Sequence, residues 1–193
     1  AMYASEAREV SGLLCGDTAR NLIRVFQLQD RLKALGRPPE FTPERLHVVG
    51  GGIMGGDIAA WCALHGLHVT LQDTEPHRLS QAMRRAHELF QRKLREPHLK
   101  QAASDRLQPD HKGFGLHHAN VVIEAIFEDL DAKRSLFHTL ELKARPDALL
   151  ASNTSSIPLE DLATALQAPE RLIGLHFFNP VARMQLVEVV HAP

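Results

Sequence analysis

In the first forty residues, apolar side chains recur at intervals of three and four along the chain. The positions that share this spacing are Leu22, Val25, Phe26, Leu28, Leu32 and Leu35. The spacing predicts an amphipathic helix that begins near Asp17 or Thr18, either of which can cap its first turn. Gly36 and the two prolines that follow are expected to end the helix, and residues 36–43 to form a linker.

Downstream of the linker, short apolar runs alternate with stretches of helical periodicity. The runs that we expect to be strands are residues 45–49, 68–71, 121–126, 148–151, 172–178 and 186–190. Residues 76–100 are predicted to form one long charged helix or a pair of helices. Strands that alternate with helices are typical of a mainly parallel sheet covered by helices. The predicted fold class is therefore α/β, a doubly wound sheet of the Rossmann type preceded by a helical linker segment, with domains at residues 1–44 and 45–193.

Composition narrows the functions that this fold could carry. The 193 residues include 22 basic and 23 acidic side chains, for a formal net charge of −1. We therefore predict no nucleic-acid partner and no attraction to an anionic membrane. No apolar run reaches the length of about 18 residues that a membrane span needs. Cys15 and Cys62 are too few and too far apart for a disulfide framework or a zinc site, so we expect a soluble protein of a reducing compartment.

The strongest local motif joins the expected strand at residues 45–49 to a helical stretch. It reads Gly50-x-Gly52-x-x-Gly55. In dinucleotide-binding folds the first glycine permits a tight turn, the second lets the backbone approach the pyrophosphate, and the third allows close packing of helix on strand. The pyrophosphate lies on the helix N-terminus. A glycine-rich turn can also be purely structural, but a P-loop is excluded because no Gly-Lys-Ser/Thr follows.

An acidic residue follows the second expected strand. Asp73 lies 23 residues after Gly50, close to where the dinucleotide-binding fold needs a carboxylate to hydrogen-bond the ribose hydroxyls of NAD. The same carboxylate would repel the additional phosphate of NADP, so we predict a preference for NAD. The alternative is that Asp73 only forms the turn after the strand.

The reaction must be defined by acid–base residues, and some common types are missing from the expected nucleotide-binding region. The sole tyrosine, Tyr3, lies outside that region, which argues against a dehydrogenase with a Tyr-x-x-x-Lys pair. Among the twelve histidines, His65 with His68 and the pair His117-His118 could be metal ligands, but neither set has further ligands around it. We interpret them as surface histidines and predict no metal site.

One histidine differs from the others in its position. His176 lies at the end of an expected strand and is followed by a proline turn and another apolar run. In an open α/β sheet, ligands bind beyond the carboxyl ends of the strands, which would place His176 near the nicotinamide. Glu188 follows 12 residues later, at a strand position where an apolar residue is expected. Adjacent strands could bring the two together, so that the carboxylate fixes the imidazole tautomer. A buried histidine and an unrelated glutamate explain the spacing equally well.

Four motifs occur in order along residues 45–193. They are GGGIMGGDIA with Asp73, VVIEAIFEDLDAK, ASNTSSIP and GLHFFNPVARMQLVEVV. Together they resemble the NAD-binding domain of L-3-hydroxyacyl-CoA dehydrogenases. The resemblance implies that His176 is the catalytic acid/base and Glu188 its partner. It also implies that Ser155 and Asn179 hydrogen-bond the substrate oxygen and help to place the nicotinamide.

The same resemblance implies a set of cofactor contacts, in which Glu128 and Lys133 match the family's cofactor-contacting pair. The residues expected at the NAD site as a whole are Gly50, Gly52, Ile53, Met54, Gly55, Asp73, Ile126, Phe127, Glu128, Lys133, Ser155 and Asn179. Two departures from the family pattern are Gly51, where alanine is usual, and Asp129, where asparagine is frequent. Neither touches the expected catalytic pair.

The N-terminal segment extends the resemblance. Residues 5–36 are similar to the helix that links hydratase and dehydrogenase modules in multifunctional fatty-acid oxidation enzymes. This similarity implies that residues 1–44 follow an upstream hydratase-like module in an alpha subunit. It further implies a thiolase beta subunit as partner and the bacterial cytoplasm, rather than the mitochondrion, as compartment. The 193 residues are then expected to lack the family's helical C-terminal domain, which completes the acyl-CoA site.

The expected function is NAD-dependent oxidation of an L-3-hydroxyacyl-CoA to the 3-ketoacyl-CoA in fatty-acid β-oxidation. Two alternatives stay open. The 193 residues alone could be an NAD-binding module without catalysis, or the enzyme could oxidise free 3-hydroxy acids. The second alternative gives no reason for a linker of the hydratase type.

Overall fold

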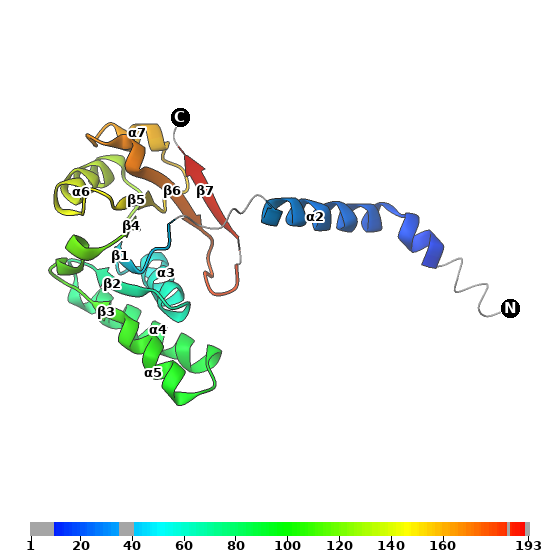
Figure 1. The fold of residues 1–193 in the computed structure, drawn as a ribbon, viewed down its shortest axis with the longest axis horizontal. Helices are drawn as coiled ribbons and strands as arrows, with labels where there is room; N and C mark the ends of the chain where they lie inside the picture. Colours follow the sequence, from blue (N-terminus) through cyan, green and yellow to red (C-terminus); the bar gives the residue numbers. More distant parts are fainter. Residues whose placement is uncertain (1–9, 35–40, 185, 192–193) are drawn as a thin grey trace. The chain divides into compact units, whose positions relative to one another are not determined.

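The computed structural model describes residues 10–34, 41–184 and 186–191. Contacts between residues divide the chain into two compact units, residues 1–42 and 43–193 (Figure 1). Within the described ranges, no helix is long and apolar enough to cross a membrane.

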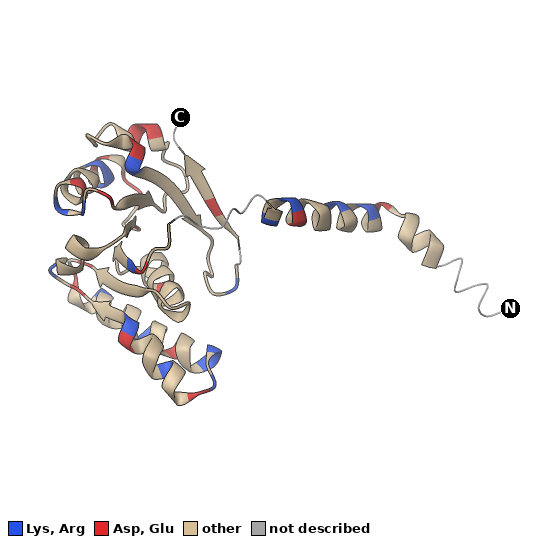
Figure 2. Ribbon diagram, viewed as in Figure 1, with Lys and Arg blue, Asp and Glu red and all other residues tan. Residues whose placement is uncertain are grey.

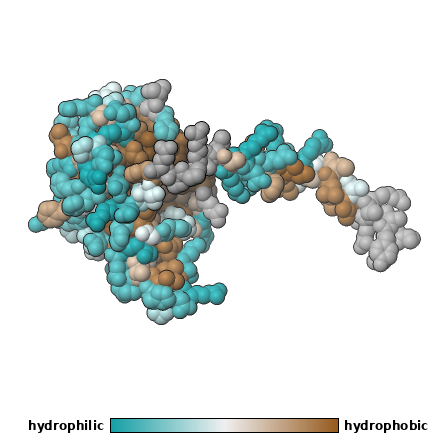
Figure 3. Space-filling model, viewed as in Figure 1, coloured by the Kyte–Doolittle hydropathy of each residue, from teal (hydrophilic) through white to brown (hydrophobic). Residues whose placement is uncertain are grey.

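The first unit is helical. Residues 10–15 are helical, and α2 (Asp17–Ala34) begins at the residue that the sequence predicts as a cap. The predicted stop at Gly36 lies outside the described residues, as does most of the expected linker. No residue of α2 is buried, and its apolar side chains form a brown strip along the helix in Figure 3. The amphipathic pattern therefore produces the helix, while its apolar face is left exposed within this unit.

The second unit is built on one seven-stranded sheet with the order β3-β2-β1-β4-β5-β6-β7. The strands are β1 (Arg45–Val49), β2 (His68–Gln72), β3 (Leu107–Pro109), β4 (Val121–Glu124), β5 (Leu149–Ser152), β6 (Leu172–Phe177) and β7 (Val187–His191). All neighbours are parallel except β6 and β7, which are antiparallel. The predicted α/β, Rossmann-like fold is confirmed. The sequence analysis missed β3, because three residues directly after a helix are too few to show a strand pattern.

Helices cover both faces of this sheet (Figure 1). They are α3 (Ile53–Leu64), α4 (Pro76–Lys93), α5 (Pro97–Arg106), α6 (Leu130–Lys143) and α7 (Leu159–Ala163), with short 3-10 turns η1 (Phe114–His118) and η2 (Pro169–Arg171). The charged stretch at residues 76–100 is thus a helix pair, and each helix begins with a proline at its first position, where the missing N–H costs nothing. Acidic and basic residues are interspersed along this pair (Figure 2).

The core consists of two apolar clusters, one on each face of the sheet. Ile123 belongs to the cluster under α3, α4 and α5, whereas its neighbour Val122 belongs to the cluster under α6 and α7. Successive strand residues point to opposite faces, so a strand that is buried on both faces needs a continuous apolar run. This burial explains the short apolar runs of the sequence. Polar groups converge instead at the edge of the sheet formed by the carboxyl ends of the parallel strands.

Candidate functional site

The turn between β1 and α3 is closely packed except at one position. Gly50 has a φ of +113°, and a Cβ there would collide with the carbonyl of Ala125. A Cβ on Gly55 would overlap the carbonyl oxygen of Gly50. Gly52, the N-cap of α3, instead faces open space, because a Cβ there would meet no atom within 4 Å. No side chain caps the first turn of α3, so this turn offers backbone N–H groups and room to a phosphate.

Arg85 of α4 hydrogen-bonds to the glycine turn and to α3. Its Nη2 donates to the carbonyl oxygen of Gly52 at 2.8 Å, and its Nε donates to Oδ1 of Asp57 on α3 at 3.2 Å. The Gly52 carbonyl is therefore bound to α4 and does not face the open side of the turn. The sequence analysis did not find Arg85, because α4 carries several arginines and this contact spans 33 residues.

Asp73 follows β2 at the same edge and is buried. Its Oδ2 accepts the N–H of Gly51 at 2.7 Å, which joins it to the glycine turn. Its Oδ1 accepts the N–H of Glu75 at 2.8 Å, the contact expected of a turn-forming aspartate. Each oxygen of a carboxylate has more than one lone pair, so these contacts leave acceptor capacity for ribose hydroxyls.

A buried ion pair lies at the end of β4. The carboxylate of Glu124, at the end of β4, is 0% exposed, and the side chain of Lys133 on α6 is 1% exposed. Lys133 Nζ donates to Glu124 Oε1 at 2.6 Å. The same carboxylate accepts the hydroxyl of Ser152 at 2.6 Å and the N–H of Ile126 at 2.8 Å. One fully hydrogen-bonded carboxylate thus joins β4, β5 and α6. The sequence analysis missed Glu124, although a charged residue inside the apolar run VVIEAI was a signal.

Glu128 connects this buried pair to the loop after β5. Lys133 Nζ also lies 3.3 Å from Glu128 Oε2. Glu128 Oε1 accepts hydrogen bonds from the hydroxyl of Thr154 and the backbone N–H groups of Ser155 and Ser156. Partial burial opposes the charge of this carboxylate, but the hydrogen bond from Thr154 and the nearby Lys133 ammonium outweigh it and lower the pKa of Glu128 to about 2. Glu128 is therefore an anion at neutral pH and anchors residues 154–156.

The structure brings His176 and Glu188 together. The antiparallel register of β6 and β7 pairs the two residues directly, and Nδ1 of His176 lies 3.0 Å from Oε2 of Glu188. The His176 side chain is 23% exposed and that of Glu188 is 52% exposed. The next residue, Phe177, donates its backbone N–H to Oδ1 of Asn153 at 2.9 Å, which ties β6 to the loop after β5. Because Nδ1 faces Glu188, Nε2 is the nitrogen available for proton exchange.

A cavity of about 340 Å³ gathers many of the predicted site residues. Its lining includes Met54, Ile126, Glu128, Ser155, His176 and Asn179. Asn153 and Phe178 line the same cavity and were not predicted. Ile53 and Phe127 are exposed and do not line it, and Lys133 is buried behind Glu128. In the described ranges, no group of three or more His, Cys, Asp or Glu side chains is placed to hold a metal ion.

The fold and this edge together define a Rossmann-type α/β domain with a glycine turn and a histidine–carboxylate pair. A family model described as "3-hydroxyacyl-CoA dehydrogenase, NAD binding domain" matches residues 45–193. The chain belongs to this family.

Solved structures of two bacterial proteins illustrate the relationship. The 3-hydroxybutyryl-CoA dehydrogenase of Escherichia coli K12 is 37% identical, with a TM-score of 0.73 over 77% of this chain and 32% of that one. FadB2 of M. tuberculosis is 35% identical, with a TM-score of 0.73 over 77% of this chain and 54% of that one. This chain thus spans about a third of the first relative and about half of the second.

A third structure, the dehydrogenase part of multifunctional enzyme 1 from C. elegans, is 25% identical, with a TM-score of 0.70 over 81% of this chain and 39% of that one. The residues present here fit the NAD of an NAD-binding domain. Gly52 leaves an open cradle at the N-terminus of α3, and the carboxylate of Asp73 stands beside it, joined to the same turn.

Proposed function

We propose that this chain carries the NAD site and the acid–base pair of an enzyme that oxidises L-3-hydroxyacyl-CoA to 3-ketoacyl-CoA in fatty-acid β-oxidation. The observation that carries the proposal is the contact between His176 and Glu188, in which His176 lines a cavity that Met54 of α3 also lines. A general base must lie within hydrogen-bond reach of the substrate hydroxyl, which must itself lie close to the cofactor. The cavity is lined both by His176 of β6 and by Met54 of α3, the helix whose N-terminus would hold the cofactor.

The chain's own residues would divide the work. The N–H groups of the glycine turn would hold the pyrophosphate, and Asp73 would accept hydrogen bonds from the ribose hydroxyls and disfavour NADP. Bound NAD would supply the acceptor for the hydride from C3 of the substrate. His176 Nε2 would take the hydroxyl proton, while Glu188 holds Nδ1 and stabilises the imidazolium. Ser155 and Asn179 would position the substrate oxygen and the nicotinamide.

The wider setting is also part of the proposal. Its relatives include a 3-hydroxybutyryl-CoA dehydrogenase and the dehydrogenase part of a multifunctional enzyme, of which this chain spans 32% and 39%. We propose that residues 1–44 link a hydratase-like module to the dehydrogenase in the alpha subunit of a bacterial, cytoplasmic complex with a thiolase beta subunit. The described helix α2, with its exposed apolar stripe, supports a segment that packs on another module.

The test is NADH oxidation with acetoacetyl-CoA by the full-length protein. His176→Gln should lower turnover by about 10²- to 10⁴-fold, with NADH affinity nearly unchanged. His98→Gln, an exposed histidine on α5, is the matched control and should keep full activity. Unchanged turnover in His176→Gln would remove this residue from the mechanism. Equal turnover with free acetoacetate would contradict the CoA substrate.

A further inference from the structure

A second cavity lies at the opposite edge of the sheet. It measures about 430 Å³, larger than the one beside His176, and the proposed chemistry does not use it. The lining residues that matter here are Arg45, His68, Arg106, Asp110, Phe114 and His118. Arg45 and His68 are the first residues of β1 and β2, whereas the glycine turn follows the last residue of β1. At about 3.3 Å per strand residue, Arg45 lies roughly 15 Å along β1 from the glycine turn.

The strand register concentrates basic groups at this edge. Arg45 and His68 are direct partners in the parallel pair of β1 and β2. In the next pair Val69 is the partner of Leu107, so Arg106 comes at the position beside His68. Three basic residues therefore stand in a row across three adjacent strand starts. The guanidiniums of Arg45 and Arg106 on either side of His68 carry positive charge, which favours an anion bound between them.

Most of these basic groups have unused donors. Arg106 donates its Nε to the carbonyl of Ala63 at 2.9 Å, which leaves its two terminal nitrogens. Across the described residues, the side chains of Arg45, His68 and His118 take part in no hydrogen bond or ion pair. The one carboxylate in the lining, that of Asp110, accepts the N–H of Gly115 through Oδ2 at 2.6 Å and keeps its Oδ1. The cavity thus sets the guanidiniums of Arg45 and Arg106 and two imidazoles against a single carboxylate.

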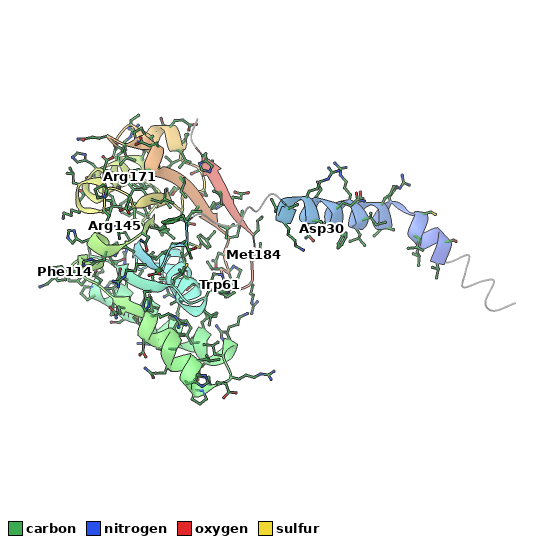
Figure 4. All side chains as sticks on the ribbon, in the orientation of Figure 1. Asp30, Trp61, Phe114, Arg145, Arg171 and Met184 are labelled. Carbon is green, nitrogen blue, oxygen red and sulfur yellow. The ribbon has the colours of Figure 1, made fainter. Side chains whose placement is uncertain are left out.

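An aromatic ring borders the same cavity. Phe114 of η1 is 67% exposed, and in Figure 4 it lies at the outer edge of the domain. Lys112 Nζ is 6.0 Å from the centre of its ring and adds a further positive charge. Exposed aromatic faces beside a cationic groove stack planar rings.

We propose that this cavity binds a small aromatic phosphate, with the phosphate held by Arg45 and His68 and the ring stacked on Phe114. Its volume lies within the range of about 300–1,000 Å³ that small-molecule sites occupy, which is more than a bare phosphate ion fills. The phosphate contacts proposed here use no residue of the NAD site. The existence of this site can therefore be tested whether or not the proposed dehydrogenase activity is correct.

The experiment is an NMR titration of the ¹⁵N-labelled 193-residue chain with phenyl phosphate, inorganic phosphate and phenol. The reporters are the amides of Thr70 and Gly115, which line the cavity. An anion at the glycine turn would instead shift the amides near Gly52. We expect saturable shifts of the cavity amides with phenyl phosphate at millimolar concentrations, weaker binding of inorganic phosphate, and no response to phenol.

Three variants make the assignment specific. Arg45→Gln should weaken phenyl phosphate about tenfold, because it removes a charge-assisted contact from an exposed side chain with no folding role. Phe114→Ala should weaken phenyl phosphate but not inorganic phosphate. Arg95→Gln, an exposed arginine between α4 and α5, is the control and should change neither. Absence of saturable shifts at the two reporter amides, or equal affinity of Arg45→Gln and the unmodified chain, would overturn the proposal.

Discussion

Two pairs of a basic side chain and a carboxylate lie near the carboxyl edge of the sheet, and they differ in burial and in their hydrogen bonds. Lys133 and Glu124 are 1% and 0% exposed, and a hydroxyl and a backbone N–H complete the carboxylate's hydrogen bonds. His176 and Glu188 are 23% and 52% exposed and contact each other through one hydrogen bond. The first pair joins three elements of the scaffold, whereas the second is open to a ligand and can exchange a proton.

The difference shows that the buried pair stabilises the domain, whereas the exposed pair is placed to react. A buried charge is tolerated only when its partners satisfy it, so the pair of Glu124 and Lys133 fixes the geometry around it. Glu128 extends that geometry to the loop after β5, and Asn153 of that loop binds the backbone beside His176. The buried pair of Glu124 and Lys133 thus fixes the position of the exposed pair of His176 and Glu188. Substitutions in the two pairs should change the free energy of unfolding by very different amounts.

The largest effect is expected from Lys133→Met. The variant leaves the fully buried carboxylate of Glu124 without its cation, and unpaired buried charges typically cost about 3–5 kcal/mol. Urea unfolding measures this loss. Lys143→Met, on the exposed last turn of the same helix, should change the free energy of unfolding by less than about 1 kcal/mol. Equal losses in the two variants would show that the buried pair has no such role.

A double variant tests whether Glu124 and Lys133 act as a pair. Glu124→Gln with Lys133→Met removes both charges, so the double variant should be more stable than Lys133→Met alone. Urea unfolding of the unmodified chain, Lys133→Met, Glu124→Gln and the double variant gives the coupling between the two positions. If the two losses simply add, the residues do not act as a pair.

An intermediate effect is expected from Glu128→Gln, and it should depend on pH. The pKa of Glu128 is about 2 in the folded chain and about 4.3 in an unfolded one. The unfolded state therefore takes up a proton first as the pH falls, and the stability that the carboxylate contributes is present above about pH 4.3 and lost toward pH 2. The gap in melting temperature between the unmodified chain and Glu128→Gln should shrink over that window.

The control for this prediction is Glu170→Gln, an exposed glutamate in η2. Its melting temperature should follow that of the unmodified chain at every pH. Hydrogen exchange gives an independent reading, because the N–H groups of Ser155 and Ser156 face a neutral amide oxygen in Glu128→Gln, a weaker acceptor than the carboxylate, and should exchange faster. Unchanged exchange at both amides would contradict the anchoring role of Glu128.

The smallest effect on stability is expected from Glu188→Gln. Exposed pairs contribute about 0–1 kcal/mol, so unfolding should barely change. The imidazole should respond instead, because the carboxylate favours the tautomer with its proton on Nδ1. Long-range ¹H–¹⁵N spectra of His176 report the tautomer directly. If the proton stays on Nδ1 to the same extent in both proteins, Glu188 does not orient the ring.

The sequence predicted those features that depend on local pattern or on neighbouring strands. The six expected strands are present within one or two residues at each end, and the adjacency of β6 and β7 was enough to bring His176 to Glu188. Glu124 was not predicted, since its partner Lys133 reaches it only through the turn between β4 and α6. Arg85 was missed for the same reason, because its contact depends on how α3 and α4 pack rather than on spacing along the chain.

The proposed dehydrogenase chemistry depends on an NAD site formed by the glycine turn and Asp73. Fluorescence titration of the 193-residue chain with NADH and NADPH tests it most directly, with Asp73→Asn as the variant and Asp105→Asn, an exposed aspartate on α5, as the control. We predict that the unmodified chain and the control bind NADH at least about tenfold more tightly than NADPH, and that Asp73→Asn reduces this ratio because the repelling charge is gone. Failure of NADH to bind, or equal affinity for both nucleotides in the unmodified chain, would contradict the claim.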